Sequence, residues 1–320
     1  RSRRGRRWKN PTPLFKAVLL CLAAGCKGLT EAEELMQDMP PWVRKMVGIR
    51  KAIADTTLRT FLCKAHPVEL CKLTYIVAYD AWKRGAIRLL DGFPFHAVSL
   101  DGKYPSVSDV GRSDNHEKSK FLQVHHDKET KEPTHGLVRT VTATLVTAIG
   151  RPVIGVTPIP GDTNEKGSFK KAFGDLVRLF GRRFKMVMYD AGATCRSNAD
   201  AVIAAGKHYL FQIADPRWEM YKTVELLFEG KTPTARDFQV ISEKKKTLLG
   251  RELTVLPLSA CAKDTIFWPH TRSLFKVHSK TYVEGVLTGT KTRYFVCSME
   301  PSALSPEKWL ALIVLRWGVE

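Results

Sequence analysis

The sequence predicts an α/β fold with a mixed sheet, preceded by a helical region and extended by β-rich residues. Three observations support this. Residues 1–90 show mainly helical periodicity, residues 94–228 show strand-like runs that come first consecutively and then alternate with helices, and residues 229–300 show short strands separated by turns. A chain of 320 residues with 44% apolar content can bury a sizeable core.

The N-terminal region, residues 1–90, is expected to form several short helices. Thr30-Glu31-Ala32-Glu33 has the pattern of a capping box, a short helix is expected from Asp55 or Thr56, and a longer one from Pro67 to about Arg84. Short helices with tight turns are typical of a helix-turn-helix, in which Arg59 would lie on the recognition helix. An ordinary helical bundle that serves dimerisation explains the pattern equally well.

The central region, residues 94–228, predicts the element order βββαβαβα. The first seven of these elements are expected as strands 95–101, 137–147 and 153–159, helix 167–180, strand 184–190, helix 196–205 and strand 208–214. This order is that of the ribonuclease H-like mixed sheet, in which the first and fourth strands are neighbours. Asp101 and Asp190, which end these two strands, are therefore expected to lie together.

Residues 229–300 are expected to form an inserted β subdomain of five short strands, at 238–241, 251–256, 274–277, 280–287 and 294–298. A further helix should start after Ser305 and run to the chain end, residues 305–320. On that helix Trp309, Ile313, Arg316 and Glu320 form one stripe. A carboxylate on an apolar stripe indicates a ligand, and an exposed terminal Glu is the alternative.

The charge balance predicts a polyanionic partner. Lys and Arg total 51 against 32 Asp and Glu, which gives a net charge of +19, and an excess of this size favours nucleic acid. The early apolar stretch 17–26 is about half the length of a membrane span, which needs about 20 residues. Seven cysteines without a Cys-x-x-Cys pair argue against a zinc ribbon or disulfide framework and favour a reducing cytoplasm.

Three short acidic motifs resemble those of a known family. Leu100-Asp101-Gly102-Lys103, Tyr189-Asp190-Ala191-Gly192 and Leu315-Arg316-Trp317-Gly318-Val319-Glu320 are similar to the three motifs of bacterial insertion-sequence DDE transposases that have a β insertion before the Glu. The turn Gly161-Asp162-Thr163-Asn164-Glu165 is similar to the family's turn after the third strand. The resemblance covers residues 14–320.

The resemblance implies a catalytic centre in which Asp101, Asp190 and Glu320 coordinate two Mg²⁺ ions, or Mn²⁺. Such a centre would cleave strands at transposon ends and transfer them to target DNA. The implied partner is double-stranded DNA, as terminal inverted repeats and as target, with no membrane and with a homodimer on DNA. The implied location is the bacterial cytoplasm, at the nucleoid when DNA is bound.

Two features depart from the family pattern. The family's last helix continues past the Glu, whereas this sequence stops on Glu320. We therefore expect a truncated helix that holds Glu320 poorly, which argues against catalytic activity of this exact polypeptide. The family's Lys-Gly-Asn-Gln-like turn after the fifth strand is replaced by residues 213–217, Ile-Ala-Asp-Pro-Arg.

Five basic residues are candidates for DNA contacts: Lys103, Arg316, Lys170, Lys171 and Arg59. For Lys170 and Lys171 a solvated outer helix face is the more common explanation. Two alternative functions remain open at this point. One is a ribonuclease H-like nuclease without strand transfer, and the other is an inactive, DNA-binding transposase remnant.

Overall fold

The computed structural model describes residues 11–65, 67–104, 106–107, 121–260, 268 and 270–317. The chain forms two compact units, Arg1–Leu70 and Cys71–Glu320. The first unit therefore ends earlier than the helical region 1–90 that the sequence indicates. Among the described residues, no helix is both long and apolar enough to cross a bilayer.

The N-terminal unit is helical. Its helices are α1 (Thr12–Ala23), α2 (Leu29–Asp38), α3 (Pro41–Met46) and α4 (Asp55–Lys64), and α5 (Pro67–Lys83) starts within it and runs on into the second unit. The core of this unit is a cluster of buried side chains: Leu14, Ala17, Cys21, Ala32, Met36, Ile49 and Leu58.

The helix starts of this unit differ by one or two residues from the predicted ones. Gly28 is the N-cap of α2, and Thr30 lies inside the first turn, so the predicted capping box is wrong. Glu31 in the first turn instead accepts a hydrogen bond from the backbone N–H of Lys27, the residue before the N-cap, at 2.7 Å. In α4 the cap position is Ala54, and Asp55 is the first helical residue.

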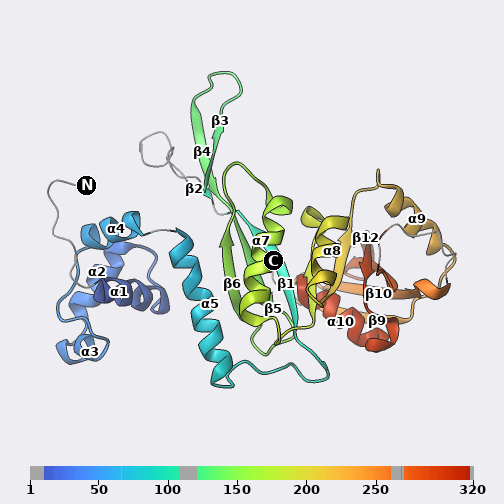
Figure 1. Ribbon diagram of the computed structural model, residues 1–320, viewed down its shortest axis with the longest axis horizontal. Coiled ribbons are helices and arrows are strands. Elements are labelled where there is room, and N and C mark those ends of the chain that lie inside the picture. Colours follow the sequence, from blue (N-terminus) through green and yellow to red (C-terminus); the bar gives the residue numbers. More distant parts are fainter. Residues whose placement is uncertain are drawn as a thin grey trace. The chain divides into compact units, whose positions relative to one another are not determined.

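The second unit is built on a nine-stranded sheet with the strand order β6-β5-β1-β7-β8-β12-β11-β10-β9. The bounds of its first five strands in chain order are β1 (Ala97–Lys103), β5 (Thr140–Leu145), β6 (Val153–Pro158), β7 (Met186–Tyr189) and β8 (His208–Ile213). β1 pairs with β5 antiparallel and with β7 parallel, and β7 pairs with β8 parallel. This is the ribonuclease H-like arrangement that the element order predicted (Figure 1).

Helices cover both faces of this sheet and create two cores. α7 (Glu165–Phe180) packs on one face with Leu100 and Tyr189. α10 (Pro306–Trp317) packs on the other face with Ala97 and Met188. α8 (Arg196–Ala204) and α9 (Glu219–Leu227) contribute to the same core as α7. A Ser305 hydroxyl accepts from the Lys308 backbone N–H at 3.4 Å, which agrees with the predicted start of α10.

The predicted strand 137–147 is in fact two strands in different sheets. β4 (Pro133–Val138) pairs with β2 (Ser106–Val107) and β3 (Leu122–His126) in a three-stranded sheet, and β5 then starts at Thr140. The break falls at Arg139, whose Nη2 donates to the carbonyl oxygens of Pro160, Gly161 and Thr163. The β3–β4 hairpin projects beyond the large sheet (Figure 1).

The region 229–300 forms four strands: β9 (Ala235–Ser242), β10 (Thr247–Pro257), β11 (Ser273–Val283) and β12 (Val286–Cys297). The two strands predicted at 274–277 and 280–287 are one, because the reversal comes later, at Glu284 and Gly285, which both have positive φ. These inserted strands continue the central sheet. β12 pairs antiparallel with β8, so all four strands extend the large sheet.

Candidate active site at the ends of β1 and β7

Asp101 lies on β1, which continues to Lys103, and Asp190 directly follows β7, the neighbouring parallel strand in the middle of the sheet. β1 and β7 pair in register up to Leu100 with Tyr189, and the next residue on each chain is one of the two aspartates. Adjacent strands lie about 4.8 Å apart. The adjacency expected from the strand order is therefore present, while the metal-binding role of the two residues stays a prediction.

The alternation of side chains places both aspartates on the α10 side of the sheet edge. Ala97 and Met188 pack in the core beneath α10, whereas Leu100 and Tyr189 pack in the core beneath α7. Since neighbouring strand residues point to opposite faces, the two aspartates share the direction of Ala97 and Met188.

The loop after β7 fixes the Asp190 carboxylate. Its Oδ1 accepts from the Gly192 backbone N–H at 2.9 Å and caps the 3-10 turn Ala191–Ala193. The Asp190 carbonyl accepts from the Thr194 hydroxyl at 2.7 Å. Asp190 is thus oriented by its own turn, with one carboxylate oxygen not used by that turn.

Asp101 is ion-paired with Lys103, one of the residues predicted to contact DNA. The Lys103 ammonium lies 2.6 Å from Asp101 Oδ2, and the two side chains are 40% and 16% exposed. The same Oδ2 is buried and makes no hydrogen bond of good geometry among the described residues, so the contact is a close ion pair rather than a directed bond. Lys103 therefore balances the charge at the site where a cation would bind Asp101.

Glu165 is a third carboxylate, which lies beside the residues that follow Asp101 and Asp190. It was not among the site residues that the sequence predicted. A Cβ built on Gly102 would overlap the Glu165 carboxyl group, and one built on Gly192 would lie 2.7 Å from Glu165 Oε2 and 3.2 Å from Asp190 Oδ1. The side chain thus fits against the backbone of both strand ends only because each aspartate is followed by a glycine within two residues.

The local sequence explains how Glu165 is held. Asn164 is the N-cap of α7 and accepts from the Gly167 backbone N–H at 2.9 Å, which makes Glu165 the first helical residue. Arg139 holds the preceding turn through the carbonyls of Pro160, Gly161 and Thr163. The signal was therefore available in Gly161–Glu165, the turn already noted for its family resemblance.

The electrostatics at this edge are those of crowded carboxylates. Burial raises the pKa of Glu165 above its usual value, and the charges of Asp190 and Asp101 raise it further, whereas a hydrogen bond with Tyr104 and the charge of Arg139 oppose the shift. Burial also raises the pKa of Tyr189, with Glu165 as the largest charge contribution. The Tyr189 side chain is fully buried and its hydroxyl has no hydrogen-bond partner among the described residues.

These groups have the donor chemistry of a magnesium site. Carboxylate oxygens are the protein ligands that Mg²⁺ and Mn²⁺ prefer, and the charges of Asp190 and Asp101 contribute to the raised pKa of Glu165. Within the described part of the chain, no three His, Cys, Asp or Glu side chains already form a metal cage. The third predicted ligand, Glu320, lies outside the described residues.

α10 presents the stripe that the sequence predicted, as far as the structure describes it. Trp309 and Ile313 are fully buried, and Arg316 is 5% exposed with its Nη1 donating to Gln212 Oε1 on β8 at 3.3 Å. The Arg316 side chain is therefore bonded to the sheet in this structure, and its contact with DNA stays a prediction. The remaining candidates, Lys170 and Lys171 on α7 and Arg59 on α4, are exposed.

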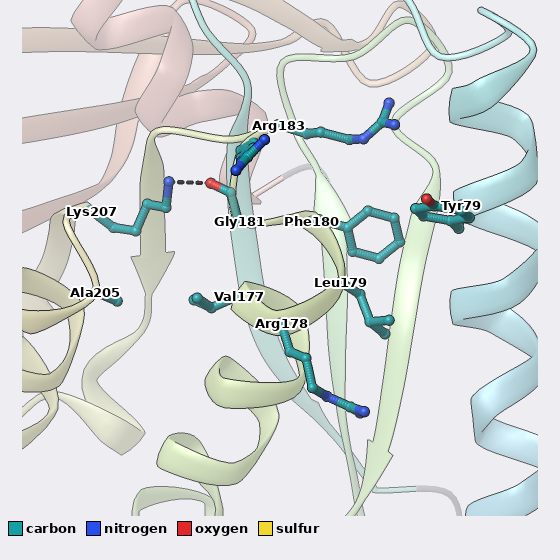
Figure 2. Close-up of a pocket in the computed structure, with 10 residues that line it drawn as sticks. Tyr79, Val177, Arg178, Leu179, Phe180, Gly181, Arg183, Ala205 and Lys207 are labelled. Atoms are coloured by element: carbon teal, nitrogen blue, oxygen red, sulfur yellow. Dashed lines mark hydrogen bonds between the residues drawn. The ribbon is translucent and has the colours of Figure 1, made fainter.

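A depression at the C-terminal end of α7 is also lined by cations. Three of them, Lys207, Arg183 and Arg178, have partners within the fold. Figure 2 shows the Lys207 ammonium directed at the Gly181 carbonyl, to which it donates. Arg183 lies over the rings of Tyr79 and Trp82, at 5.7 and 5.4 Å from the ring centroids, and Arg178 pairs with Asp175 at 3.0 Å. These contacts are accounted for by complementing a helix C-terminus and by cation–π packing.

Comparison with known proteins gives structural matches only, since no family model and no curated protein matches the chain. The cryo-EM structure of a piggyBac transposase synaptic complex with hairpin DNA matches with 11% identity and a TM-score of 0.43, covering 99% of this chain and 60% of that chain. The Mos1 transposase paired-end complex with the left transposon end matches with 12% identity and a TM-score of 0.23, covering 64% and 61%. This chain thus spans about 60% of the piggyBac transposase chain. Its own sheet order identifies it as ribonuclease H-like.

Proposed function

We propose that this protein is a DDE-type DNA transposase of the insertion-sequence kind, which cleaves strands at transposon ends and transfers them to target DNA. One observation carries the proposal. Asp101 lies on β1 and Asp190 directly follows β7, and each comes directly after the last residue by which these two parallel strands pair. The acidic motifs and the net charge of +19 agree with double-stranded DNA as the partner.

The proposed chemistry assigns each side chain a role. Two bound Mg²⁺ ions would activate a water or 3′ hydroxyl and stabilise the leaving oxygen in an in-line displacement. Asp101, Asp190 and Glu320 would hold them. Lys103, now paired with Asp101, must give up this contact when a metal binds. A homodimer on DNA would bring two transposon ends together.

The proposal is tested by the nicking of supercoiled plasmid DNA in Mg²⁺ or Mn²⁺. Asp101→Asn and Asp190→Asn are each expected to reduce nicking by at least about 100-fold, because losing one metal ligand removes several kcal/mol of transition-state stabilisation. Asp200→Asn is the matched control, since Asp200 is an exposed residue of α8 that only faces Arg196 at 3.9 Å. Unchanged nicking in both site variants would refute the proposal.

A joining assay separates the transposase from its two alternatives. A duplex oligonucleotide with a free 3′ hydroxyl is incubated with plasmid, and covalent joining that requires Asp190 supports strand transfer. Nicking without joining would assign the chain to the ribonuclease H-like nucleases. DNA binding with neither reaction would make it a DNA-binding remnant.

A further inference from the structure

The N-terminal unit contains a basic cavity that none of the predicted site residues lines. It has a volume of about 860 Å³ and is lined by Pro13, Lys45, Gly48, Ile49, Arg50, Lys51 and Ile53. Its lining thus combines three cations with an apolar wall and includes no acidic residue. Ile49 is fully buried, which anchors the loop between α3 and α4 to the core of the unit.

Lys16 brings a fourth cation to the same loop. Gly48 has a φ of +78°, and a Cβ added there would lie 2.9 Å from Lys16 Nζ. The glycine therefore serves both the turn and the close approach of the α1 side chain. Lys16, Lys45, Arg50 and Lys51 are all exposed, so their charged groups are accessible from solvent.

These four cations have no ion-pair partner among the described residues, unlike Arg178, Arg183 and Lys207 near the end of α7, which have partners. Among the described residues, none of the four takes part in an ion pair or a side-chain hydrogen bond. Two acidic residues of α2 are engaged elsewhere: Glu31 accepts from the Lys27 backbone N–H, and Glu33 accepts from the Gln37 side chain and from the Asp55 backbone N–H. Four like charges gathered without a counter-charge favour an anionic ligand.

We propose that the basic cavity binds backbone phosphates of duplex DNA. The loop that lines it leads directly into α4, whose exposed residues include Thr56, Arg59 and Thr60. In helix-turn-helix readers, phosphate contacts beside the recognition helix set its position in the groove. Lysine ammonium groups act as point charges and suit the phosphate backbone rather than base edges. The inference rests on the proposed function, because that function makes DNA the substrate.

The test is the binding of a fluorescent duplex by the full chain, measured by anisotropy over a range of salt concentrations. The variant K45E/R50E/K51E is compared with K244E/K245E/K246E, three exposed lysines at the β9–β10 turn. Both variants change the net charge equally. The cavity variant is expected to bind at least about tenfold more weakly, with a salt slope smaller by about three, and the control variant within about threefold of wild type. If charge reversal affects folding, the neutral variant K45Q/R50Q/K51Q replaces it and should also bind the duplex more weakly than wild type and the control variant.

Equal weakening by both charge-reversed variants would overturn the proposal, since it would show an effect of net charge alone. Unchanged binding by the cavity variant would also overturn it. The outcome is separable from that of the proposed function. Binding by the cavity variant is measured without nicking, so weakened binding supports the cavity whether or not the aspartates prove necessary for nicking, whereas the proposed function fails if Asp190→Asn still nicks plasmid.

Discussion

At the scale of single residues, the site is defined by carboxylates that repel one another and by the small residues that let them meet. Asp101 and Asp190 were identifiable because each ends an apolar run. Glu165 was not, because its approach depends on Gly102 and Gly192, which are distant in sequence and close only in the folded sheet. Burial of Arg316 against Gln212 was hidden for the same reason.

Glu165 makes stability depend on pH. Its pKa is raised in the folded protein, so its contribution to stability is fully present at pH values below the unfolded pKa and is lost as pH rises through the folded pKa. Glu165→Gln is therefore expected to raise the melting temperature more at pH 7 than at pH 4. The same substitution at the exposed Glu229 serves as the control. A gain that is equal at the two pH values would contradict this account.

At the scale of elements, the sequence was sufficient where periodicity was long and local. α5, α7, α8 and α10 and the central strands lie within a few residues of their predicted positions. The failures are in pairing. Nothing in the local alternation of residues 133–145 shows that β4 and β5 join different sheets, because that depends on the contacts of Arg139 with a turn about 20 residues away.

The docking of α5 on β6 offers a pair of opposed glycine substitutions. A Cβ on Gly155 would overlap the buried Tyr75 ring, which is held by a 3.0 Å hydrogen bond to Thr157. Gly155→Ala is expected to lower the free energy of unfolding by about 1–3 kcal/mol. Gly174, inside α7, faces open space, so Gly174→Ala is expected to raise it by about 0.5–1 kcal/mol. Denaturant unfolding measures both changes in the free energy of unfolding. If the two substitutions changed it in the same direction, the packing described here would be wrong.

At the scale of the whole molecule, two compact units divide the proposed work. The N-terminal unit carries unpaired cations around the basic cavity, and the second unit carries the carboxylates at the ends of β1 and β7. Composition alone indicated a polyanionic partner from the +19 charge, yet it could not separate cations that have partners from those that do not. The two kinds of cation are told apart only by contacts in the folded protein, such as the approach of Lys16 to Gly48 and the hydrogen bond from Lys207 to the Gly181 carbonyl.

The most direct test of the central claim is to locate Mn²⁺ in crystals by anomalous diffraction. The account predicts an anomalous peak within coordination distance of the Asp101 and Asp190 carboxylates, with the Lys103 ammonium displaced from Asp101, and loss of that peak in Asp190→Asn. Ordered aspartates with Lys103 still paired and no peak between the ends of β1 and β7 would contradict it.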